Sequence, residues 1–519
     1  MHEQALSADR SAPSIHPVIQ LHPADNVVIG RGTLLPGAPA GGGVTAVQRI
    51  PPGHKIAVRP IKNGEPVLKY NQIIGFATQP IAPGEHVHVH NMGMGDFDKD
   101  YAYGVDAKPT DYFAEPATFE GIVRPDGRVA TRNYIGILTS VNCSAHTAGL
   151  IADAFKRNPF TGNDPLAEFP NVDGVVALTH KTGCGMGEGE ELALLRRTLA
   201  GYARHPNFSH IIMIGLGCEV NQIGEILREH KLTDRIRNMD IQSMGGTRKT
   251  VQAGLDFVRE VLKEANGVSR QPVPAHHLKV ALQCGGSDGY SGVSANPALG
   301  IASDLIVRNG GTVILAETTE SYGAEHLFTR RAVSREVGER LVGLMRWWEE
   351  YTRKHGSEIN ANPSPGNKAG GLTTIIEKSL GAMAKAGSTN LVDVVKYAEA
   401  VTKSGFVLMD TPGFDPVAAT GQVAGGANLV CFTTGRGSVF GCKPAPSVKI
   451  ATNTPLFQRM EEDMDINCGT IIDGSETIQE AGQRIFEHIL RVASGERTKS
   501  ESYDAGSAEF APWPIGATV

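Results

Sequence analysis

Four cysteines stand at or just after the ends of apolar runs that have the composition of β-strands. The runs are ILTSVNC, VVALTHKTGC, IIMIGLGC and KVALQC, and they end at Cys143, Cys184, Cys218 and Cys284. In parallel sheets the carboxyl ends of neighbouring strands meet along the edge where ligands bind. Because thiolates bind iron, zinc and iron–sulfur clusters, we expect these cysteines to hold a metal. The alternative is that each cysteine is a small buried hydrophobic residue.

Histidines near the N-terminus form the second group of candidate catalytic residues. His54 follows a glycine in PPGHK, and His86 and His88 alternate along GEHVHVH. On a β-strand these alternating residues share one face. An imidazole can act as a general acid or base, or bind a metal. For His90 we favour a solvated position on an edge strand.

His180 and Lys368 complete the candidate catalytic residues. His180 lies four residues before Cys184, where it can act as a base. In a competing account it binds iron together with Glu219, and the cysteines only pack in the core. Lys368 lies in the glycine-flanked turn NPSPGNKAGG, which is either part of the site or an ordinary turn at a helix N-terminus.

Polar residues in glycine-rich turns form the candidate substrate site. Arg and Lys are suited to capturing a carboxylate, and Asn is suited to the hydroxyl groups of a polyol. The glycine-rich loops can also bring backbone N–H groups close to an anion. They do not match a dinucleotide fingerprint or a Walker motif. The residues that we expect to bind substrate are Arg132, Asn133, Ser287, Asp288, Asn296, Asn367, Arg436 and Lys449.

The elements that must position these residues change in character along the chain. Short alternating strands with Asn-Gly and Pro-Gly turns come first, and an aperiodic stretch over 92–117 follows them. After it, apolar strands alternate with amphipathic helices, which is typical of parallel sheets covered by helices. Clear helical spacing predicts helices in 247–266, 334–354 and 475–494, and we expect an extended surface tail from Lys499. The predicted domains are a β-rich module over 17–105 and α/β domains over 118–270 and 276–519.

Composition restricts the class of protein. The 519 residues carry 49 Lys and Arg against 55 Asp and Glu, a net charge of −6, which predicts neither nucleic-acid nor membrane binding. The seven cysteines contain no CxxC pair, so we expect free thiols in a reducing cytoplasm. The first residues lack the apolar region of a secretory signal, and no run approaches 18 apolar residues. We therefore expect a cytoplasmic small-molecule enzyme.

The motifs together resemble the altronate/galactarate dehydratase family of sugar-acid hydro-lyases. The similar segments include GHK, THKTGCG, IGLGCE, QCGGSDGYSGVSANPALG, NPSPGNKAGG, FTTGRG and VASGE. The resemblance extends from about residue 17 to 515, and Ala361 departs from it where the family pattern has Glu. GEHVHVHN and ESYGAEHL look altronate-type, whereas DMDIN looks galactarate-type. On these motifs we favour altronate.

The resemblance implies a fold, a cofactor and a reaction. The implied fold is an N-terminal SAF-type β-clip module followed by a two-part α/β body with parallel sheets. The implied cofactor is Fe²⁺, with Mn²⁺, another divalent metal or an iron–sulfur cluster as alternatives. The implied reaction converts D-altronate to 2-keto-3-deoxy-D-gluconate by removal of the C2 proton and loss of the 3-hydroxyl.

Other functions and partners stay open at this point. Galactarate dehydration, or a related lyase reaction such as that of a sulfo-lyase, uses the same enediolate stabilisation. A protein that binds a sugar acid without turnover is the non-enzyme alternative, although thiol, imidazole and ammonium groups exceed what binding alone needs. The expected partner is a small sugar acid, and a homo-oligomer is an open alternative.

Overall fold

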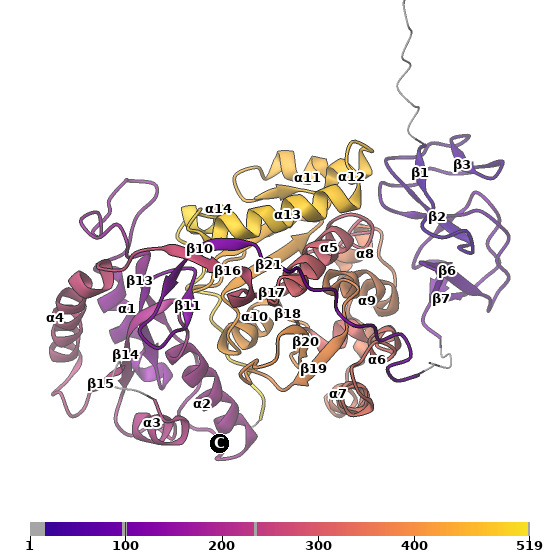
Figure 1. The fold of residues 1–519 in the computed structure, drawn as a ribbon. Helices are drawn as coiled ribbons and strands as arrows, with labels where there is room; N and C mark the ends of the chain where they lie inside the picture. The colour runs from indigo at the N-terminus through magenta and orange to yellow at the C-terminus, as the bar shows by residue number, and fades with distance from the viewer. Residues whose placement is uncertain (1–15, 96–98, 100, 233–235, 517–519) are drawn as a thin grey trace, which may run out of the picture.

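The N-terminal part of the chain folds into three small antiparallel sheets. The computed structural model describes residues 16–95, 99, 101–232 and 236–516. Residues 16–95, here called the N-terminal module, lie at the right of Figure 1. The strands, in sheet order, are β1 (Val18–Ile19), β2 (Val27–Gly30), β5 (Lys55–Ala57) and β8 (His86–Val87); β6 (Pro66–Lys69), β7 (Gln72–Ala77) and β9 (Met92–Gly93); and β3 (Pro39–Gly41) with β4 (Val44–Thr45).

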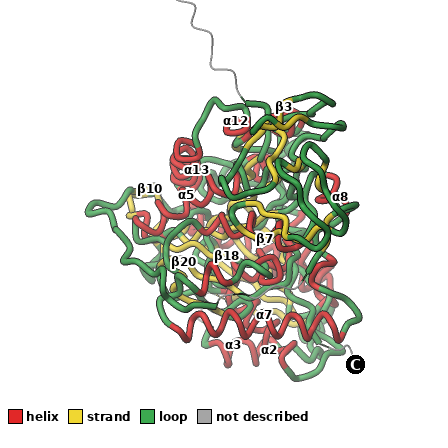
Figure 2. The backbone as a smooth tube through the Cα atoms, turned by 90° about the vertical axis from the view of Figure 1, so that its right-hand side faces the viewer, coloured by secondary structure: helices red, strands yellow, loops and turns green. Residues whose placement is uncertain are grey.

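An extended segment, residues 101–117, connects this module to the rest of the chain. Figure 1 shows the segment crossing the C-terminal domain toward the second domain, and Figure 2 shows the module from its own side. Gly104 N–H donates to the Thr329 carbonyl at 3.0 Å, and Phe113 N–H donates to the Arg308 carbonyl at 2.9 Å. The Arg308 guanidinium also lies 4.3 Å from the centre of the Phe113 ring. We call this segment the strap, because contacts hold both its ends against the C-terminal domain.

The second domain is a four-stranded parallel sheet with helices on its faces. The two central strands are mostly apolar, as expected of a sheet covered on both sides. The segment 247–266, predicted to be helical from its spacing, is the helix α4. The strands, in sheet order, are β13 (Gly174–Leu178), β12 (Tyr134–Thr139), β14 (Phe208–Gly215) and β15 (Ile236–Asp240); the helices are α1 (Ala145–Asp153), α2 (Glu190–Ala203), α3 (Ile223–His230) and α4 (Thr247–Asn266), and a 3-10 turn η1 (Asn142–Ser144) precedes α1.

A small antiparallel sheet joins the second and C-terminal domains. It consists of β11 (Val129–Ala130), β10 (Thr118–Val123) and β16 (Gln271–Pro274). The strands β10 and β16, which come before and after the second-domain sheet in the sequence, therefore pair with each other. The Glu120 N–H donates to the Ser494 hydroxyl of the C-terminal domain at 3.0 Å. The stretch between the two predicted α/β domains, residues 271–275, contains the paired strand β16.

The C-terminal domain is built on a seven-stranded parallel sheet. Its strands, in sheet order, are β19 (Leu391–Val395), β20 (Gly405–Met409), β18 (Thr312–Leu315), β17 (Lys279–Cys284), β21 (Leu429–Thr434), β22 (Ser447–Ala451) and β23 (Ile466–Asn467). Its helices are α5 (Ala295–Arg308), α6 (His326–Thr329), α7 (Arg335–Lys354), α8 (Pro365–Ala369), α9 (Ile375–Met383), α10 (Asp415–Ala424), α11 (Thr454–Arg459), α12 (Gly469–Ile472), α13 (Ile478–Ala493) and α14 (Lys499–Ser502). The 3-10 turns are η2 (Ala275–His277), η3 (Thr318–Ser321), η4 (Ile359–Ala361) and η5 (Ala384–Ala386).

Local sequence explains where the long helices begin. Ser334 caps α7 by accepting the Val337 N–H, and Thr477 and Glu480 form a capping box at the start of α13. These helices agree with the segments predicted from apolar spacing. The predicted fold class, a small β-rich module followed by an α/β body with parallel sheets, is confirmed.

The C-terminal tail differs from the expected extended surface chain. It begins with the short helix α14. Phe510 is buried with only 5% of its surface exposed, and the Trp513 ring stacks on Trp348 with 5.4 Å between ring centres. The aromatic residues of FAPWP therefore hold the tail against the body through burial of their rings.

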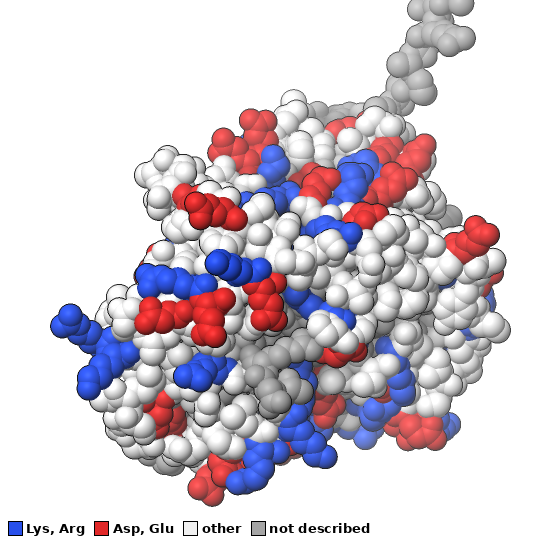
Figure 3. Space-filling model, turned by 60° about the vertical axis from the view of Figure 1, so that its left-hand side comes forward, with Lys and Arg blue, Asp and Glu red and all other residues white. Residues whose placement is uncertain are grey.

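The surface carries charges of both signs. Figure 3 shows Lys and Arg interspersed with Asp and Glu over the face that it displays, with no large field of one sign. Among the described residues, no helix is both long and apolar enough to cross a membrane.

Candidate active site between the N-terminal module and the C-terminal domain

Glycines allow the N-terminal module to touch the C-terminal domain backbone to backbone. A Cβ atom on Gly289 would collide with the Gly53 carbonyl oxygen, and one on Gly371 would lie 2.6 Å from that oxygen. The Gly289 N–H donates to the Gly370 carbonyl at 2.8 Å. The predicted motifs PPGHK, QCGGSDGYSG and NPSPGNKAGG therefore meet at this contact, although more than 300 residues separate the first from the last.

Three histidines of the module form a cluster beside this contact. The His54 Nδ1 lies 2.9 Å from the His86 Nε2, and the His86 and His88 rings stack with 5.2 Å between their centres. The His54 Nε2 lies 3.2 Å from the carbonyl oxygen of Ala369, at the end of α8. We call His54, His86 and His88 the histidine trio. Through His54 the trio joins the module to α8, which lies within NPSPGNKAGG.

Burial keeps the histidine trio neutral near pH 7. It lowers the pKa of His54, and together with nearby positive charge it lowers the pKa of His86 to about 3 and that of His88 to about 4. One ring nitrogen from each residue lies within 4.8 Å of the others. Neutral imidazoles spaced in this way are suited to binding a divalent metal.

A buried ion-pair network fastens the module next to the trio. The Glu377 carboxylate, at the start of α9, accepts the Lys55 ammonium at 2.9 Å and the Lys69 ammonium at 2.9 Å. Thr373 donates to the same carboxylate through its hydroxyl at 2.6 Å, and Lys55 also donates to the Gly371 carbonyl at 2.7 Å. All three charged side chains are at most 1% exposed.

The pKa values of this network reflect two ammonium groups sharing one carboxylate. Although burial opposes ionisation, the two lysines hold the pKa of Glu377 far below its usual range. Burial lowers the pKa of Lys55 to about 8, whereas the Glu377 charge overcomes burial at Lys69 and raises its pKa. Both lysines touch the same carboxylate, but the Lys69 charge lowers the pKa of Lys55 further, whereas contact with Tyr70 helps to raise the pKa of Lys69.

A cavity of about 420 Å³ opens on the other side of α8, at the carboxyl end of β17. This edge of a parallel sheet is the usual place for a ligand. The cavity is lined by Cys284, Gly285, Gly286, Glu320, Ala361, Asn362, Ser364, Asn367, Lys378, Gly413, Phe414 and Asp415. Its size is within the range for small-molecule sites.

Charged groups and a thiol form a connected network in the cavity wall. The Lys378 ammonium donates to Glu320 Oε1 at 2.5 Å, and the Asn362 amide donates to the same oxygen at 2.8 Å. The Lys385 ammonium lies 2.6 Å from the Cys284 Sγ, which lies 3.7 Å from Glu320 Oε2. Burial raises the pKa of the Cys284 thiol to about 12, so this sulfur is protonated near pH 7.

Two further carboxyl groups adjoin this network. Burial and the nearby Glu320 charge raise the pKa of Asp415 to about 6. Burial raises the pKa of Glu317 well above its usual value, and Glu317 Oε2 has no hydrogen-bond partner among the described residues. A Cβ on Gly285 would collide with the Asp415 carboxylate, so glycine there gives the carboxylate room against the backbone. Asp415 can therefore exchange a proton near neutral pH.

The helix α8 links the histidine trio to the cavity. Ala369, the last residue of α8, contacts His54, while Ser364, the N-cap, and Asn367, in the middle of the helix, line the cavity. Ser364 and Asn367 form a capping box, and the Asn367 amide donates to the Ser287 carbonyl at 2.9 Å. These hydrogen bonds fix α8 between the two groups of chemically active residues.

Comparison with known proteins agrees with this arrangement of domains. Three family profiles match the chain: "Altronate/galactarate dehydratase SAF domain" over 16–95, "D-galactarate dehydratase/Altronate hydrolase, second domain" over 121–266, and "D-galactarate/Altronate dehydratase, C-terminal" over 275–518. A protein named altronate dehydratase from Bacillus subtilis (strain 168) is 35% identical, over 96% of this chain and 99% of its own. The chain belongs to the altronate/galactarate dehydratase family.

Two further relatives show the range of this dehydratase family. Galactarate dehydratase (L-threo-forming) of Escherichia coli (strain K12) is 38% identical, over 96% of this chain and 97% of its own. The (2R)-sulfolactate sulfo-lyase subunit beta of Chromohalobacter salexigens is 31% identical, over 76% of this chain and 96% of its own. The family resemblance predicted from the motifs is confirmed.

The structure brings one part of the predicted site residues together. His54, His86 and His88 form the histidine trio, and Cys284 and Asn367 line the cavity. Lys368 is half-buried on α8 between them, and Arg436 is exposed on a loop whose backbone N–H donates to the Gly286 carbonyl at 2.8 Å. These residues therefore line the cavity or lie on elements next to it.

Three predicted substrate-binding residues have structural roles in and next to the glycine-rich loop that follows β17. The Asp288 carboxylate accepts the Ser291 hydroxyl at 3.0 Å and the Thr452 hydroxyl at 3.1 Å. The Asn296 amide donates to the Gly381 carbonyl at 2.9 Å, and Ser287 is buried, with its carbonyl bound to Asn367. None of the three lines the cavity described above.

Three other predicted substrate-binding residues lie outside the cavity. Arg132 is fully buried and pairs with Glu501 at 2.5 Å. The Asn133 amide donates to the Ala265 carbonyl at 2.8 Å, and the Lys449 ammonium donates to the Ser500 hydroxyl at 2.5 Å. These contacts lie within the second domain or join α14 to the second domain and to β22, so we interpret the three residues as structural.

The predicted metal ligands divide between two domains. Cys284 lies in the cavity wall of the C-terminal domain, whereas Cys143, Cys184 and Cys218 are exposed at the sheet edge of the second domain. The four cysteines belong to separate sheets and do not form the single site that we expected from the strand ends. Glu219 and His180 are buried beside the exposed cysteines.

Several residues of the cavity, of the network next to it and of the ion-pair network at the module were not singled out from the sequence. They are Glu317, Glu320, Glu377, Lys378, Lys385 and Asp415. A signal was present in LTTIIEKSLGAMAKAG, because a helix that is otherwise apolar carries Glu377, Lys378 and Lys385. Charged residues are rarely buried without partners, so such a helix predicts a buried polar network.

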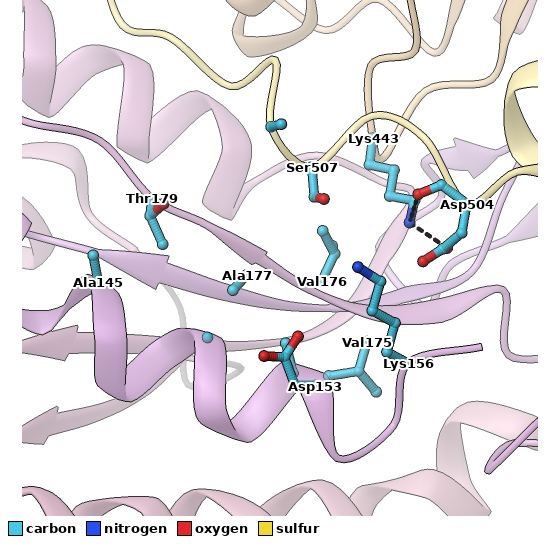
Figure 4. A pocket seen from close by; sticks show the side chains of 13 residues that line it. Ala145, Asp153, Lys156, Val175, Val176, Ala177, Thr179, Lys443, Asp504 and Ser507 are labelled. Atoms are coloured by element: carbon cyan, nitrogen blue, oxygen red, sulfur yellow. Dashed lines mark hydrogen bonds and ion pairs between the residues drawn. The ribbon is translucent and has the colours of Figure 1, made fainter. Parts of the chain in front are cut away.

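A second cavity lies between the second domain and the C-terminal tail. Figure 4 shows it between α1, β13 and the segment around Ser507, with Lys443 paired to Asp504 at its side. Its volume is about 270 Å³, and none of the predicted site residues lines it. The cavity beside α8 therefore carries the functional argument.

Proposed function

We propose that this chain dehydrates a sugar acid, D-altronate, to 2-keto-3-deoxy-D-gluconate in the cavity beside α8. The observation that carries the proposal is the link from the histidine trio, through Ala369 and α8, to a cavity that contains the Lys378 ammonium and Asp415. The names of the relatives supply the substrate class.

The histidine trio is the group that we propose to hold a divalent metal, Fe²⁺ or Mn²⁺. The fit is supported by three neutral ring-nitrogen donors within 4.8 Å of one another. Cys284, Glu317 and Glu320 form a second such group. There, however, the ammonium groups of Lys385 and Lys378 already supply the positive charge next to Cys284 and Glu320 that a metal ion would otherwise provide. A divalent metal held there would supply Lewis-acid stabilisation of negative charge.

The chain's own residues account for the proton transfers. In this proposal Lys378, whose pKa the Glu320 charge raises against the opposing effect of burial, stays cationic and holds the substrate carboxylate. Asp415, with a pKa of about 6, is ionised near pH 7 and takes the C2 proton. The same group then gives a proton to the departing 3-hydroxyl, which leaves as water.

The test is product formation by the purified full chain. D-altronate with Fe²⁺ should give a 2-keto acid, and His86→Ala should lower kcat by at least about a hundredfold, the usual contribution of a catalytic group. His22→Ala, in an exposed part of the same module, is the matched control and should behave as wild type. Calorimetric binding of altronate with no product from any sugar acid would establish a binding protein and overturn the proposal.

Galactarate is the second candidate substrate. It is supported by the relative of that name at 38% identity and by the DMDIN segment. A panel of altronate, galactarate and (2R)-sulfolactate, compared by kcat/KM, separates the alternatives. We further propose a cytoplasmic enzyme of hexuronate degradation.

A further inference from the structure

Three exposed cysteines stand at one level of the second-domain sheet. In the parallel pairing Leu138 lies opposite Leu178 and Met213. The cysteines follow these three residues by five, six and five positions, respectively. Because the strands are parallel and adjacent, the three loops leave the same edge together. We call these residues the cysteine trio: Cys143, Cys184 and Cys218.

Hydrogen bonds fasten the three cysteine-bearing loops to one another. The Asn142 N–H donates to the Thr182 carbonyl at 3.0 Å, and the Asn221 N–H donates to the Gly183 carbonyl at 3.0 Å. The Asn221 side-chain amide donates to the Ser140 carbonyl at 2.8 Å. A Cβ on Gly183 would collide with the Ser140 carbonyl oxygen. Each of these contacts is within three residues of a cysteine, so the loops form one rigid edge.

Neighbouring ionisable groups are already engaged in holding this edge. The buried Glu219 carboxylate accepts the Gly217 N–H at 2.6 Å and the Ser140 hydroxyl at 2.6 Å. The His180 ring nitrogens contact the Thr139 carbonyl at 2.8 Å and the Thr182 hydroxyl at 3.0 Å. The thiols are therefore the groups left facing outward, and the alternative that His180 and Glu219 bind iron has no support in this geometry.

The spacing of the thiols distinguishes a cluster from a single ion. Tetrahedral zinc with Zn–S bonds of about 2.3 Å holds its sulfurs about 3.8 Å apart. Among the described residues, the cysteine trio does not form a group with all ligand atoms within 4.8 Å of one another. An iron–sulfur cluster interposes several atoms between its thiolates and accommodates a wider triangle.

We propose that the cysteine trio binds a [4Fe–4S] cluster. Each thiol gives its proton to solvent and ligates one iron, and the fourth iron has no ligand from this set because such clusters have four ligand positions. The exposure of all three cysteines, in contrast to the four buried ones, leaves that iron open to water or to an oxygen of a hydroxy acid. This site is in a different domain from the histidine trio and does not rest on the function proposed above.

Anaerobic reconstitution of the full chain with equal amounts of ferrous and ferric iron, and with sulfide, tests the site. We expect about four iron and four acid-labile sulfide ions per chain, with broad visible absorption, as for such clusters. Cys184→Ser and the triple Cys→Ser variant should lose this absorption while circular dichroism shows an unchanged fold. His86→Ala is the matched control and should keep the cluster even though it loses activity. One zinc per chain without sulfide, or equal iron and sulfide in the triple variant, would overturn the proposal.

Alkylation provides a second measurement that needs no activity. In the metal-free native chain, iodoacetamide should modify the three exposed cysteines and spare the buried ones. After reconstitution the same three should be protected, and chelation of the iron should restore their reactivity. Three fully reactive thiols after reconstitution would rule out the cluster.

Discussion

The Nζ of Lys378 lies 2.5 Å from the Oε1 of Glu320, and both side chains are at least 92% buried in the cavity wall. Removing one member of a buried ion pair leaves an uncompensated charge, which typically costs about 3–5 kcal/mol. An inactive single variant could therefore reflect loss of stability alone. A test of the role of this pair therefore requires single and double variants of the two residues.

The first prediction compares Lys378→Met with Lys378→Met/Glu320→Gln. The single variant should unfold at lower temperature, and the double variant should regain much of that stability because no unpaired charge remains. If Lys378 holds the substrate carboxylate, the double variant should still have at least about tenfold lower kcat/KM, equivalent to about 1.4 kcal/mol. Kinetics and thermal unfolding measure the two effects separately. Recovery of both stability and activity would show that the pair is only structural.

The second prediction concerns the pH profile set by Asp415. Because its pKa is raised to about 6 and the ionised form acts as the base, kcat/KM should rise with pH through about 6 and then level off. Asp415→Asn should lose this limb and at least about a hundredfold of the rate. Glu487→Gln, an exposed change on α13, is the control and should keep the wild-type profile. An unchanged acidic limb in Asp415→Asn would assign the proton transfer to another group.

The third prediction concerns Arg436, which the sequence places in TTGRG and the structure places beside Gly286. If its guanidinium reaches the substrate carboxylate, Arg436→Ala should lower kcat/KM at least about tenfold, or about 1.4 kcal/mol. Arg346→Ala, an exposed arginine on α7, is the matched control. Steady-state kinetics of the two variants measure the effect. Wild-type values for Arg436→Ala would remove this residue from the site.

The fourth prediction tests the buried network that fastens the module. Glu377→Gln removes the anion shared by Lys55 and Lys69, so the free energy of unfolding should fall by about 3–5 kcal/mol. Thermal or urea unfolding, followed by circular dichroism, measures the loss. Glu339→Gln, which removes an exposed ion pair with Arg335, should change stability little. Equal stability of Glu377→Gln and wild type would contradict a fastening role.

The sequence predicted those features that depend on local spacing. The helices over 247–266 and 334–354 follow from apolar residues three and four apart, and the alternation of strands and helices predicted parallel sheets. Gly53, Gly289 and Gly371 meet at the module contact, a role that their motifs did not indicate, because from the sequence these loops suggested only the binding of an anion. What the sequence could not show is which loops face each other.

Some predicted site residues have other roles in the structure because their partners lie far away along the chain. Arg132 lies in a polar turn, which is typical of a binding site, but its partner Glu501 is 369 residues away. The exposed cysteines and Cys284 all follow apolar strands, yet their strands belong to different sheets. Local patterns give the type and the end of each strand, whereas pairing across domains depends on long-range packing that no single segment contains.

The strap has a consequence for how the module and the body find each other. Residues 101–117 keep the module on the same chain as the Glu377 carboxylate that its lysines contact. Docking is therefore an intramolecular event, and a short tether supplies an effective concentration in the millimolar range. Dilution of the protein cannot separate the N-terminal module from the rest of the chain. Each C-terminal domain therefore always has one histidine trio available. A break in the strap would turn docking into a two-body equilibrium whose extent depends on protein concentration.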